Sequence, residues 1–242
     1  MARIDVHGIS DIGFVRKKNE DVFKIIEENF LFSIADGMGG HKAGDIAAKE
    51  ATGHLCNLLI KNLNSNISAD EIINFIDLAI KETNFRIYSL SKSRQELLGM
   101  GTTLCCLYLS SQFAIFGHIG DSRIYHFQKN VLTQLTKDHS LINKLKDQNK
   151  NYSHILHKNI ITKAVGTHPT VEPSIGKIAY NLGDIFLMST DGLTDYISNS
   201  DIKTIIEKSS DCKNVCENLI NEAKNNGSRD NITCIAVKIL SV

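Results

Sequence analysis

Short apolar runs occur in groups along this chain, and segments with helical periodicity separate the groups. The first two groups predict strands at Arg3–Ile9, Val22–Glu28, Phe30–Ala35, Thr103–Leu109, Phe113–Ile119, Arg123–Phe127 and Val131–Thr136. Further strands are expected at Ile160–Ala164, Ser174–Tyr180, Asp184–Ser189 and Ile232–Leu240. Most consecutive strands follow one another without an intervening helix, which indicates antiparallel sheets with helices packed outside them. The expected fold class is therefore α+β, a layered sandwich.

Four segments carry the strongest helical patterns. Apolar residues recur at helical spacing within residues 43–63, and a second apolar stripe extends from Ile72 to Ile87. Ser68 and Glu71 have the spacing of a capping box, in which a hydroxyl and a carboxylate satisfy free backbone amides. Two more helices are expected at Asp201–Lys208 and Asp211–Lys224, and residues 140–147 are weakly helical.

The composition limits the class of protein. The chain has 242 residues without a Pro/Ser linker, a low-complexity tract or a repeat, which predicts one domain, 1–242. Lys plus Arg equals Asp plus Glu at 27 each, a balance that argues against nucleic-acid partners and membrane surfaces. No apolar run reaches the roughly 18 residues that span a bilayer. The 6 cysteines show no C-x-x-C spacing, which indicates free buried thiols and a cytoplasmic location.

Aspartates stand at the ends of several predicted strands. Asp36, Asp121 and Asp191 directly follow apolar strands, and Asp21 and Asp230 precede others. Burying a carboxylate at such a place is costly unless a cation or a donor meets it, and neighbouring carboxylates repel each other. The pattern is explained if these strand ends converge on a divalent cation. Oxygen donors without a His or Cys set favour Mg²⁺ or Mn²⁺ over zinc.

Each of these acids also has an ordinary explanation when it is taken alone. Asp-Gly is a common hairpin turn, and both Asp36-Gly37 and Asp191-Gly192 have this sequence. Here both pairs are followed by helix-like sequence and not by a returning strand. The glycines also allow the backbone to turn sharply and to approach an ion closely. The combination of acids therefore carries the metal hypothesis.

At this point the residues match a family. The chain resembles the metal-dependent protein phosphatases of the protein phosphatase 2C family in their bacterial form, through motifs that follow in family order from residue 10 to 233. These motifs are Ser10-Asp11-Ile12-Gly13 with Arg16 and Asn19-Glu20-Asp21, Ala35-Asp36-Gly37-Met38-Gly39-Gly40, Gly101-Thr102-Thr103, Gly120-Asp121-Ser122-Arg123, Leu135-Thr136 with Asp138-His139-Ser140, Thr162-Lys163-Ala164-Val165-Gly166, Ser189-Thr190-Asp191-Gly192-Leu193 with Asp195, and Asp230-Asn231-Ile232-Thr233.

The resemblance implies a fold and a set of metal ligands. The family fold is a four-layer αββα sandwich, with two antiparallel sheets flanked by helices. By resemblance, two Mn²⁺ or Mg²⁺ ions and a weaker third one are bound. The first ion is held by Asp36, Asp191 and Asp230; the second by Asp36 and the Gly37 carbonyl, with Glu20 and Asp21 acting through water; and the third by Asp121 with Asp191. Asn231 is expected to orient Asp230.

The resemblance also implies hydrolysis of phosphoserine and phosphothreonine in proteins. A hydroxide bridging two metal ions attacks the phosphoryl group in line, without a covalent intermediate. Arg16 is expected to grip two phosphoryl oxygens with its planar fork. Some family members have a His at the position of Met38, which is often proposed as the general acid, and methionine cannot fill that role. A monomer is expected, and its partners are phosphoproteins, among them a Hanks-type kinase and its targets.

Residues 138–160 fall where the family carries a flap beside the active site. After its first residue, Asp138, this segment contains four lysines and a single acid, Asp147. It is interpreted either as a basic flap that steers phosphorylated loops or as a variable surface loop.

Three other functions stay open. One is a catalytically inactive family member that acts as a binding or regulatory module, and another is a two-metal phosphodiesterase or nuclease. A serine hydrolase using Ser122, Ser140 or Ser189 is the third, although the chain has no Gly-x-Ser-x-Gly elbow.

Overall fold

Two antiparallel sheets form the centre of the computed structural model, which describes residues 3–38, 43–63, 67–148 and 160–241. One sheet has the order β1-β11-β10-β7-β8, and the other has the order β2-β3-β5-β6-β9, with β4 paired to β3. The strands are β1 (Arg3–Asp11), β2 (Asp21–Ile26), β3 (Leu31–Met38), β4 (Gly101–Thr102), β5 (Leu104–Leu109), β6 (Phe113–Ile119), β7 (Arg123–Gln128), β8 (Val131–Gln134), β9 (Ser174–Ala179), β10 (Ile185–Ser189) and β11 (Ile232–Ser241).

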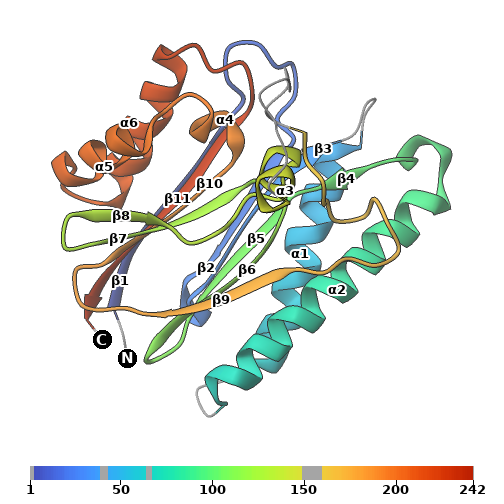
Figure 1. Cartoon of the computed structure of the whole chain (residues 1–242), viewed down its shortest axis with the longest axis horizontal. Helices are drawn as coiled ribbons and strands as arrows, with labels where there is room; N and C mark the ends of the chain where they lie inside the picture. Colours follow the sequence, from blue (N-terminus) through green and yellow to red (C-terminus); the bar gives the residue numbers. More distant parts are fainter. Residues whose placement is uncertain (1–2, 39–42, 64–66, 149–159, 242) are drawn as a thin grey trace.

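Helices cover the outer face of each sheet (Figure 1). The long helices α1 (Gly44–Asn62) and α2 (Ala69–Ser93) pack on the β3-containing sheet, and α5 (Asn199–Lys208) and α6 (Cys212–Asn225) pack on the other. Two short helices, α3 (Leu141–Asp147) and α4 (Asp191–Thr194), lie near the strand ends. The expected four-layer αββα sandwich is therefore confirmed.

Three apolar cores fill the spaces between the layers. In β3, Phe32 and Ile34 point into the core between the sheets, and the alternate residues Leu31 and Ala35 pack under α1. This alternation follows from the two-residue repeat of a strand. It explains why the central strands read as continuous apolar runs, since both of their faces are buried.

Most of the predicted elements are present. The capping box at the start of α2 is confirmed, because Ser68 accepts from the Glu71 amide and Glu71 accepts from the Ser68 amide. The strand predicted at Ile160–Ala164 is wrong. This stretch makes only isolated bridges, from Ile161 to Ser140, and from the adjoining Val165 to Thr102. Its backbone therefore links two different elements and does not extend a sheet.

Two further sequence predictions concern a membrane span and the flap segment. No helix in the described part of the chain is both long and apolar enough to cross a membrane. Of the predicted flap segment 138–160, the structure describes residues 138–148, which include α3, and residue 160. Residues 149–159 lie outside the described residues.

Candidate metal centre

Strands β2 and β3 of one sheet and β10 and β11 of the other bring predicted acids together at one edge of the sandwich. Asp21 begins β2 and lies opposite Asp36 in the antiparallel register of β3. Asp191 begins α4, two residues after the end of β10, and Asp230 lies two residues before β11, the neighbour of β10. The two sheets are joined here, because Thr190 Oγ1 donates a hydrogen bond of 2.8 Å to Asp21 Oδ2.

The backbone around Asp36 is tightly held. The Asp36 amide donates to Thr103 Oγ1 at 2.8 Å, and the Asp36 carbonyl accepts from Thr103 N and Thr102 Oγ1, both at 2.8 Å. At the next residue, a Cβ on Gly37 would lie 2.1 Å from the Gly44 carbonyl oxygen. No side chain fits there without moving the start of α1, so close packing requires glycine. The sharp turn expected here is absent, because Gly37 lies within β3 and pairs with Thr102.

Mutual repulsion and burial raise the pKa values of the clustered carboxyl groups. Burial is the largest cause that raises the pKa of Asp21 to about 7. Nearby carboxylates add to this increase, and hydrogen bonds from Thr hydroxyls oppose it in part. Burial and the charge of Asp191 raise the pKa of Asp121 to about 7, and burial and the charge of Asp230 raise the pKa of Asp191 to about 6. The pKa of Asp36 rises well above its ordinary value for the same reasons. Full ionisation at neutral pH therefore requires a positive charge among these groups.

Two buried carboxylate oxygens at this edge, Asp121 Oδ1 and Asp191 Oδ1, have no hydrogen-bond partner among the residues that the structure describes. Leaving such atoms unpaired is costly, and a bound cation removes the cost. The described residues hold no group of three or more His, Cys, Asp or Glu side chains already gathered around one point. One of the acids, Asp230, instead pairs with Arg16. The oxygen-only donor set, the unpaired oxygens and the raised pKa values fit a hard divalent cation such as Mg²⁺ or Mn²⁺.

Arg16 lies at the outer side of this cluster. Its Nη2 donates to Asp230 Oδ2 at 2.6 Å, and its side chain is about half exposed (49%). The guanidinium therefore has donors left for a ligand that arrives from solvent. The structure thus places the predicted phosphate-binding arginine beside the clustered acids.

Asn231 acts differently from the sequence expectation. Its side chain accepts from the Glu20 amide at 2.9 Å and donates to the carbonyls of Ile12 and Lys18, both at 3.0 Å. Only its backbone N–H contacts Asp230, at Oδ1 and 2.8 Å. The side chain therefore fastens the segment between β1 and β2, which carries Arg16 and Glu20, to the start of β11.

Hydroxyl side chains that support the acids were missed by sequence reasoning. Thr190 holds Asp21, and Thr103 holds the Asp36 amide and lies 2.7 Å from Ser122 Oγ. Each of these residues stands inside a motif quoted above, within two residues of an acid or a glycine. That adjacency was the available signal.

A small pocket of about 230 Å³ adjoins the acid cluster. Asp121 and Asp191 lie on one side, and Asn143 and Lys146 of α3 also line it. The beginning of the predicted flap segment therefore borders the site.

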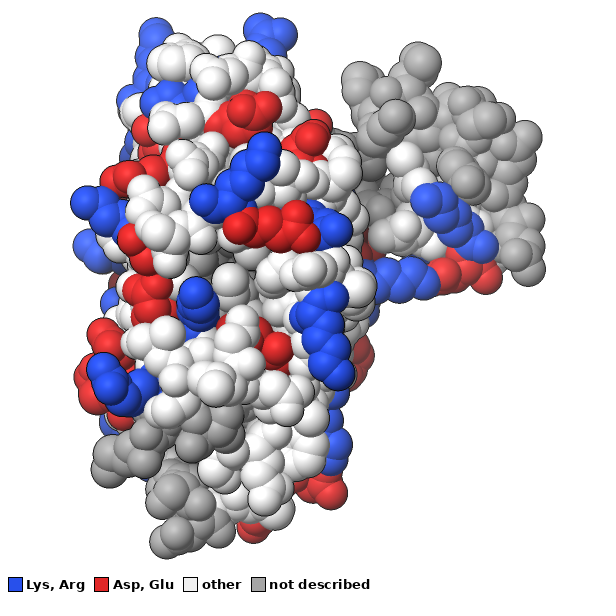
Figure 2. Space-filling view, turned by 90° about the vertical axis from the view of Figure 1, so that its left-hand side faces the viewer, with Lys and Arg blue, Asp and Glu red and all other residues white. Residues whose placement is uncertain are grey.

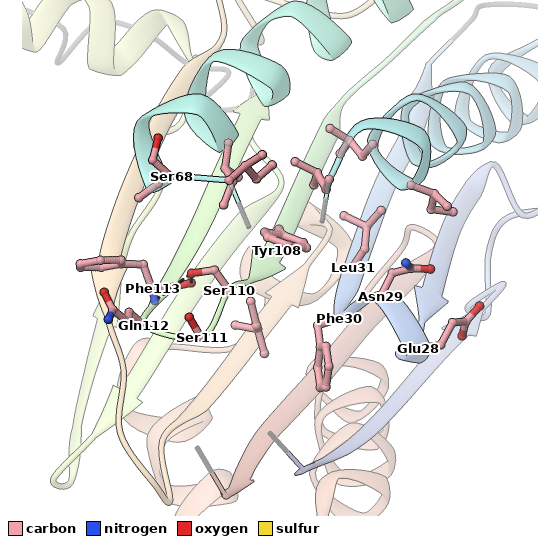
Figure 3. A pocket seen from close by; sticks show the side chains of 17 residues that line it. Glu28, Asn29, Phe30, Leu31, Ser68, Tyr108, Ser110, Ser111, Gln112 and Phe113 are labelled. Atoms are coloured by element: carbon pink, nitrogen blue, oxygen red, sulfur yellow. Dashed lines mark hydrogen bonds between the residues drawn. The ribbon is translucent and has the colours of Figure 1, made fainter. Parts of the chain in front are cut away.

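A larger pocket, of about 500 Å³, lies between the beginnings of β3 and α2 (Figure 3). Its wall is mostly apolar, with Leu31 and Phe113 on opposite sides of Tyr108. Its lining includes none of the predicted acids, so it is separate from the candidate centre.

The sequence pattern of the family described as protein phosphatase 2C matches residues 17–230. The chain belongs to this family. The serine/threonine phosphatase stp of Listeria monocytogenes serotype 4b is 33% identical to this protein phosphatase 2C chain, over 95% of the chain and 93% of the relative. The phosphatase Stp1 from Staphylococcus aureus is 33% identical in sequence and superposes with a TM-score of 0.90, covering 98% of this chain and 95% of that one.

One related structure bears on the metal. The catalytic domain of the serine/threonine protein phosphatase PstP, in complex with 2 manganese ions, matches this chain with a TM-score of 0.87 and 29% identity. The match covers 100% of both chains. Membership of the family and its fold are thus confirmed, and dependence on a divalent metal follows with them.

Proposed function

We propose that this protein phosphatase 2C chain hydrolyses phosphoserine and phosphothreonine in proteins with the help of divalent cations. The observation that carries the proposal is the convergence of five aspartates from both sheets, with unpaired oxygens on Asp121 and Asp191. A cluster of this kind has no evident use as an apolar core or as a surface turn. Family membership supplies the substrate class, a phosphorylated protein.

The proposed ligand assignment follows the family motifs. Asp36, Asp191 and Asp230 would hold the first cation, and Asp36 with the Gly37 carbonyl would hold the second. Glu20 and Asp21 would act on the second cation through water, and Asp121 with Asp191 would hold a third. Burial and the charge of nearby Asp45 keep the pKa of Glu20 raised, although Lys18 opposes them, and this supports a position close to the other acids.

The chain's own residues position the substrate for reaction. Bound divalent cations supply a nucleophile by lowering the pKa of water, and they neutralise the phosphoryl charge. Arg16 would bind two phosphoryl oxygens through its fork while Asp230 keeps the guanidinium in place. Asn231 and the Thr190–Asp21 hydrogen bond hold these groups in fixed positions, which lowers the reorganisation needed at the transition state.

The balanced charge of the chain and the one face that Figure 2 shows support protein substrates over nucleic acid. On the face that Figure 2 shows, Lys and Arg side chains stand among Asp and Glu side chains, and neither sign forms a continuous patch. A nuclease needs a basic track for the phosphate backbone. All the family acids are present in this sequence, which also speaks against an inactive binding module.

Several finer points belong to the same proposal. We propose Mn²⁺ or Mg²⁺ as the cation, a monomer with one phosphatase domain over residues 1–242, and substrates phosphorylated by a Hanks-type kinase. The 6 cysteines are all free and buried, which supports the cytoplasm as the compartment.

Phosphate release from a phosphothreonine peptide is the test of the proposed function. The purified protein, stripped with EDTA, is expected to release phosphate only after Mn²⁺ is added, and Asp36→Asn is expected to be inactive at every Mn²⁺ concentration. Cleavage of single-stranded DNA or of bis(p-nitrophenyl) phosphate in preference to the peptide would favour the phosphodiesterase. Absence of peptide hydrolysis with Mn²⁺ measurably bound would contradict the proposal.

Replacing Arg16 by alanine is expected to weaken substrate binding more than it slows turnover. Loss of a charge-assisted hydrogen bond to the phosphoryl group should raise KM for a phosphothreonine peptide by roughly tenfold, with a smaller change in kcat. Arg16→Lys should recover only part of the loss, since lysine lacks the planar fork. Steady-state kinetics measures both, and an unchanged KM in Arg16→Ala would remove Arg16 from the substrate site.

A further inference from the structure

The imidazole of His139 lies between the turn that carries Asp121 and strand β9. Its Nδ1 accepts a hydrogen bond of 3.1 Å from the Gly120 backbone N–H, and its Nε2 lies 2.9 Å from Ser174 Oγ. Since Nδ1 accepts, this network assigns the ring proton to Nε2, which donates to the serine. Burial, with smaller contributions from His118 and Lys163, lowers the pKa of His139 to about 3, so the ring is neutral at physiological pH.

The same residue holds Gly120 a second time through its backbone. His139 N donates to the Gly120 carbonyl at 2.9 Å, so both backbone polar groups of Gly120 are bound by one residue. Gly120 has a φ of +104°, and a Cβ there would lie 2.6 Å from Thr103 Cγ2. Glycine adopts such a φ without strain but can leave it as easily, so the turn needs support from outside to keep this conformation. His139 supplies that support directly before Asp121.

His139 also joins the two ends of the predicted flap segment. Its carbonyl accepts from Thr162 N at 2.7 Å and from Thr162 Oγ1 at 3.0 Å. Its ring stacks on His118 with centroids 4.6 Å apart and planes within 6°. The preceding residue, Asp138, accepts from Arg123 Nε at Oδ1 and from Arg123 Nη2 at Oδ2, and Arg123 lies two residues after Asp121. The base of the segment and the Asp121 turn are therefore one connected unit.

We propose that His139 is a positioning residue for Asp121: its neutral Nδ1 fixes the Gly120–Asp121 turn so that the Asp121 carboxylate is presented to the weakest of the bound cations. The inference rests on the proposed function, which assigns Asp121 to that cation. The unpaired Asp121 Oδ1 is the atom that would bind this cation. Without the Nδ1 acceptor, the Gly120 N–H loses its partner, and the turn is free to relax away from this position.

Two conservative variants separate the functions of the two ring nitrogens. His139→Asn places an amide oxygen near the position of Nδ1 and keeps an acceptor for Gly120. His139→Gln places its amide near the position of Nε2 and reaches Ser174, but not the Gly120 N–H. Both variants remove the imidazole and its stack on His118, so they lose the same packing. Ser174→Ala removes only the hydrogen bond at Nε2.

The test measures Mn²⁺ binding to the full-length protein in a titration, and the electron paramagnetic resonance signal of free Mn²⁺ reports the unbound ion. The weakest binding step is expected to lose about tenfold in affinity in His139→Gln, and less than about twofold in His139→Asn and Ser174→Ala. The tighter steps are expected to stay at wild-type affinity in all three variants. Asp121→Asn is the positive control, which should abolish the weakest step.

Several results would overturn the proposal. Wild-type affinity in His139→Gln would do so, as would equal losses in the Asn and Gln variants, since packing alone would then explain them. Loss of every Mn²⁺ step, or a wild-type titration that ends at two ions, would also count against it. A wild-type protein that binds the weakest ion normally yet releases no phosphate from a phosphothreonine peptide would contradict the proposed function and leave the role of His139 intact.

Discussion

Asp191→Asn is expected to lower kcat/KM for a phosphothreonine peptide by roughly a thousandfold or more, with the fold intact. Asp191 follows β10 and lies among Asp36, Asp121 and Asp230, so its carboxylate is proposed to touch two of the cations. Asparagine keeps the size of the side chain and one oxygen but removes the negative charge. The expected loss is therefore mainly in turnover, because charge neutralisation at the phosphoryl group depends on correctly held cations.

Kinetics with saturating Mn²⁺ and circular dichroism spectra of both proteins check this result. Glu207→Gln is a matched control, since it removes one carboxylate charge from α5 that pairs with Lys203 in the preceding turn of the same helix. That control should keep wild-type kcat/KM. Wild-type activity in Asp191→Asn would contradict the assignment of the whole centre, whereas an unfolded variant would require the same measurement on Asp121→Asn, which we expect to have a smaller effect.

The positions of the acids relative to the ends of apolar runs could be read from the sequence because they are local, and Asp36 and Asp191 each end such a run. The register that places Asp21 opposite Asp36 is a property of the folded sheet. Which strand ends would face each other across the two sheets is a long-range property. Only the resemblance to a family indicated it, and the Thr190–Asp21 hydrogen bond between the sheets could not be read from either segment alone.

The errors have the same origin. Residues 160–164 have the apolar pattern of a strand, but the chain uses them to connect Ser140 with the stretch before β9, so they form single bridges. The family resemblance led to the expectation that Asn231 orients Asp230, and its backbone N–H does contact Asp230 Oδ1. Its side-chain amide is instead needed by Ile12, Lys18 and Glu20, whose backbone groups lack partners in regular structure. A sequence shows which polar groups exist, and folding decides which of them require a partner.

Metal-free protein is expected to become less stable as the pH rises from 5 to 8. Asp21 and Asp121 have folded-state pKa values of about 7 and Asp191 of about 6, all above the ordinary value of 3.8. At these three groups the folded state therefore binds more protons than the unfolded chain between these values. Their contribution to stability is full below about pH 4 and is lost as the pH rises through 6 to 7. The midpoint of thermal unfolding should fall by roughly 5 °C or more over this range.

Bound Mn²⁺ should remove most of that pH dependence, because the cation supplies the positive charge that the ionised carboxylates lack. Differential scanning calorimetry at pH 5 and pH 8, with EDTA and with Mn²⁺, should show a larger stabilisation by Mn²⁺ at pH 8. Asp191→Asn provides the sharpest comparison. Without metal at pH 8, it removes one of the repelling charges and should unfold at a higher temperature than wild type, although it is the variant expected to lose the most activity. A lower unfolding temperature for metal-free Asp191→Asn at pH 8 would show that repulsion among these carboxylates is not what destabilises the empty centre.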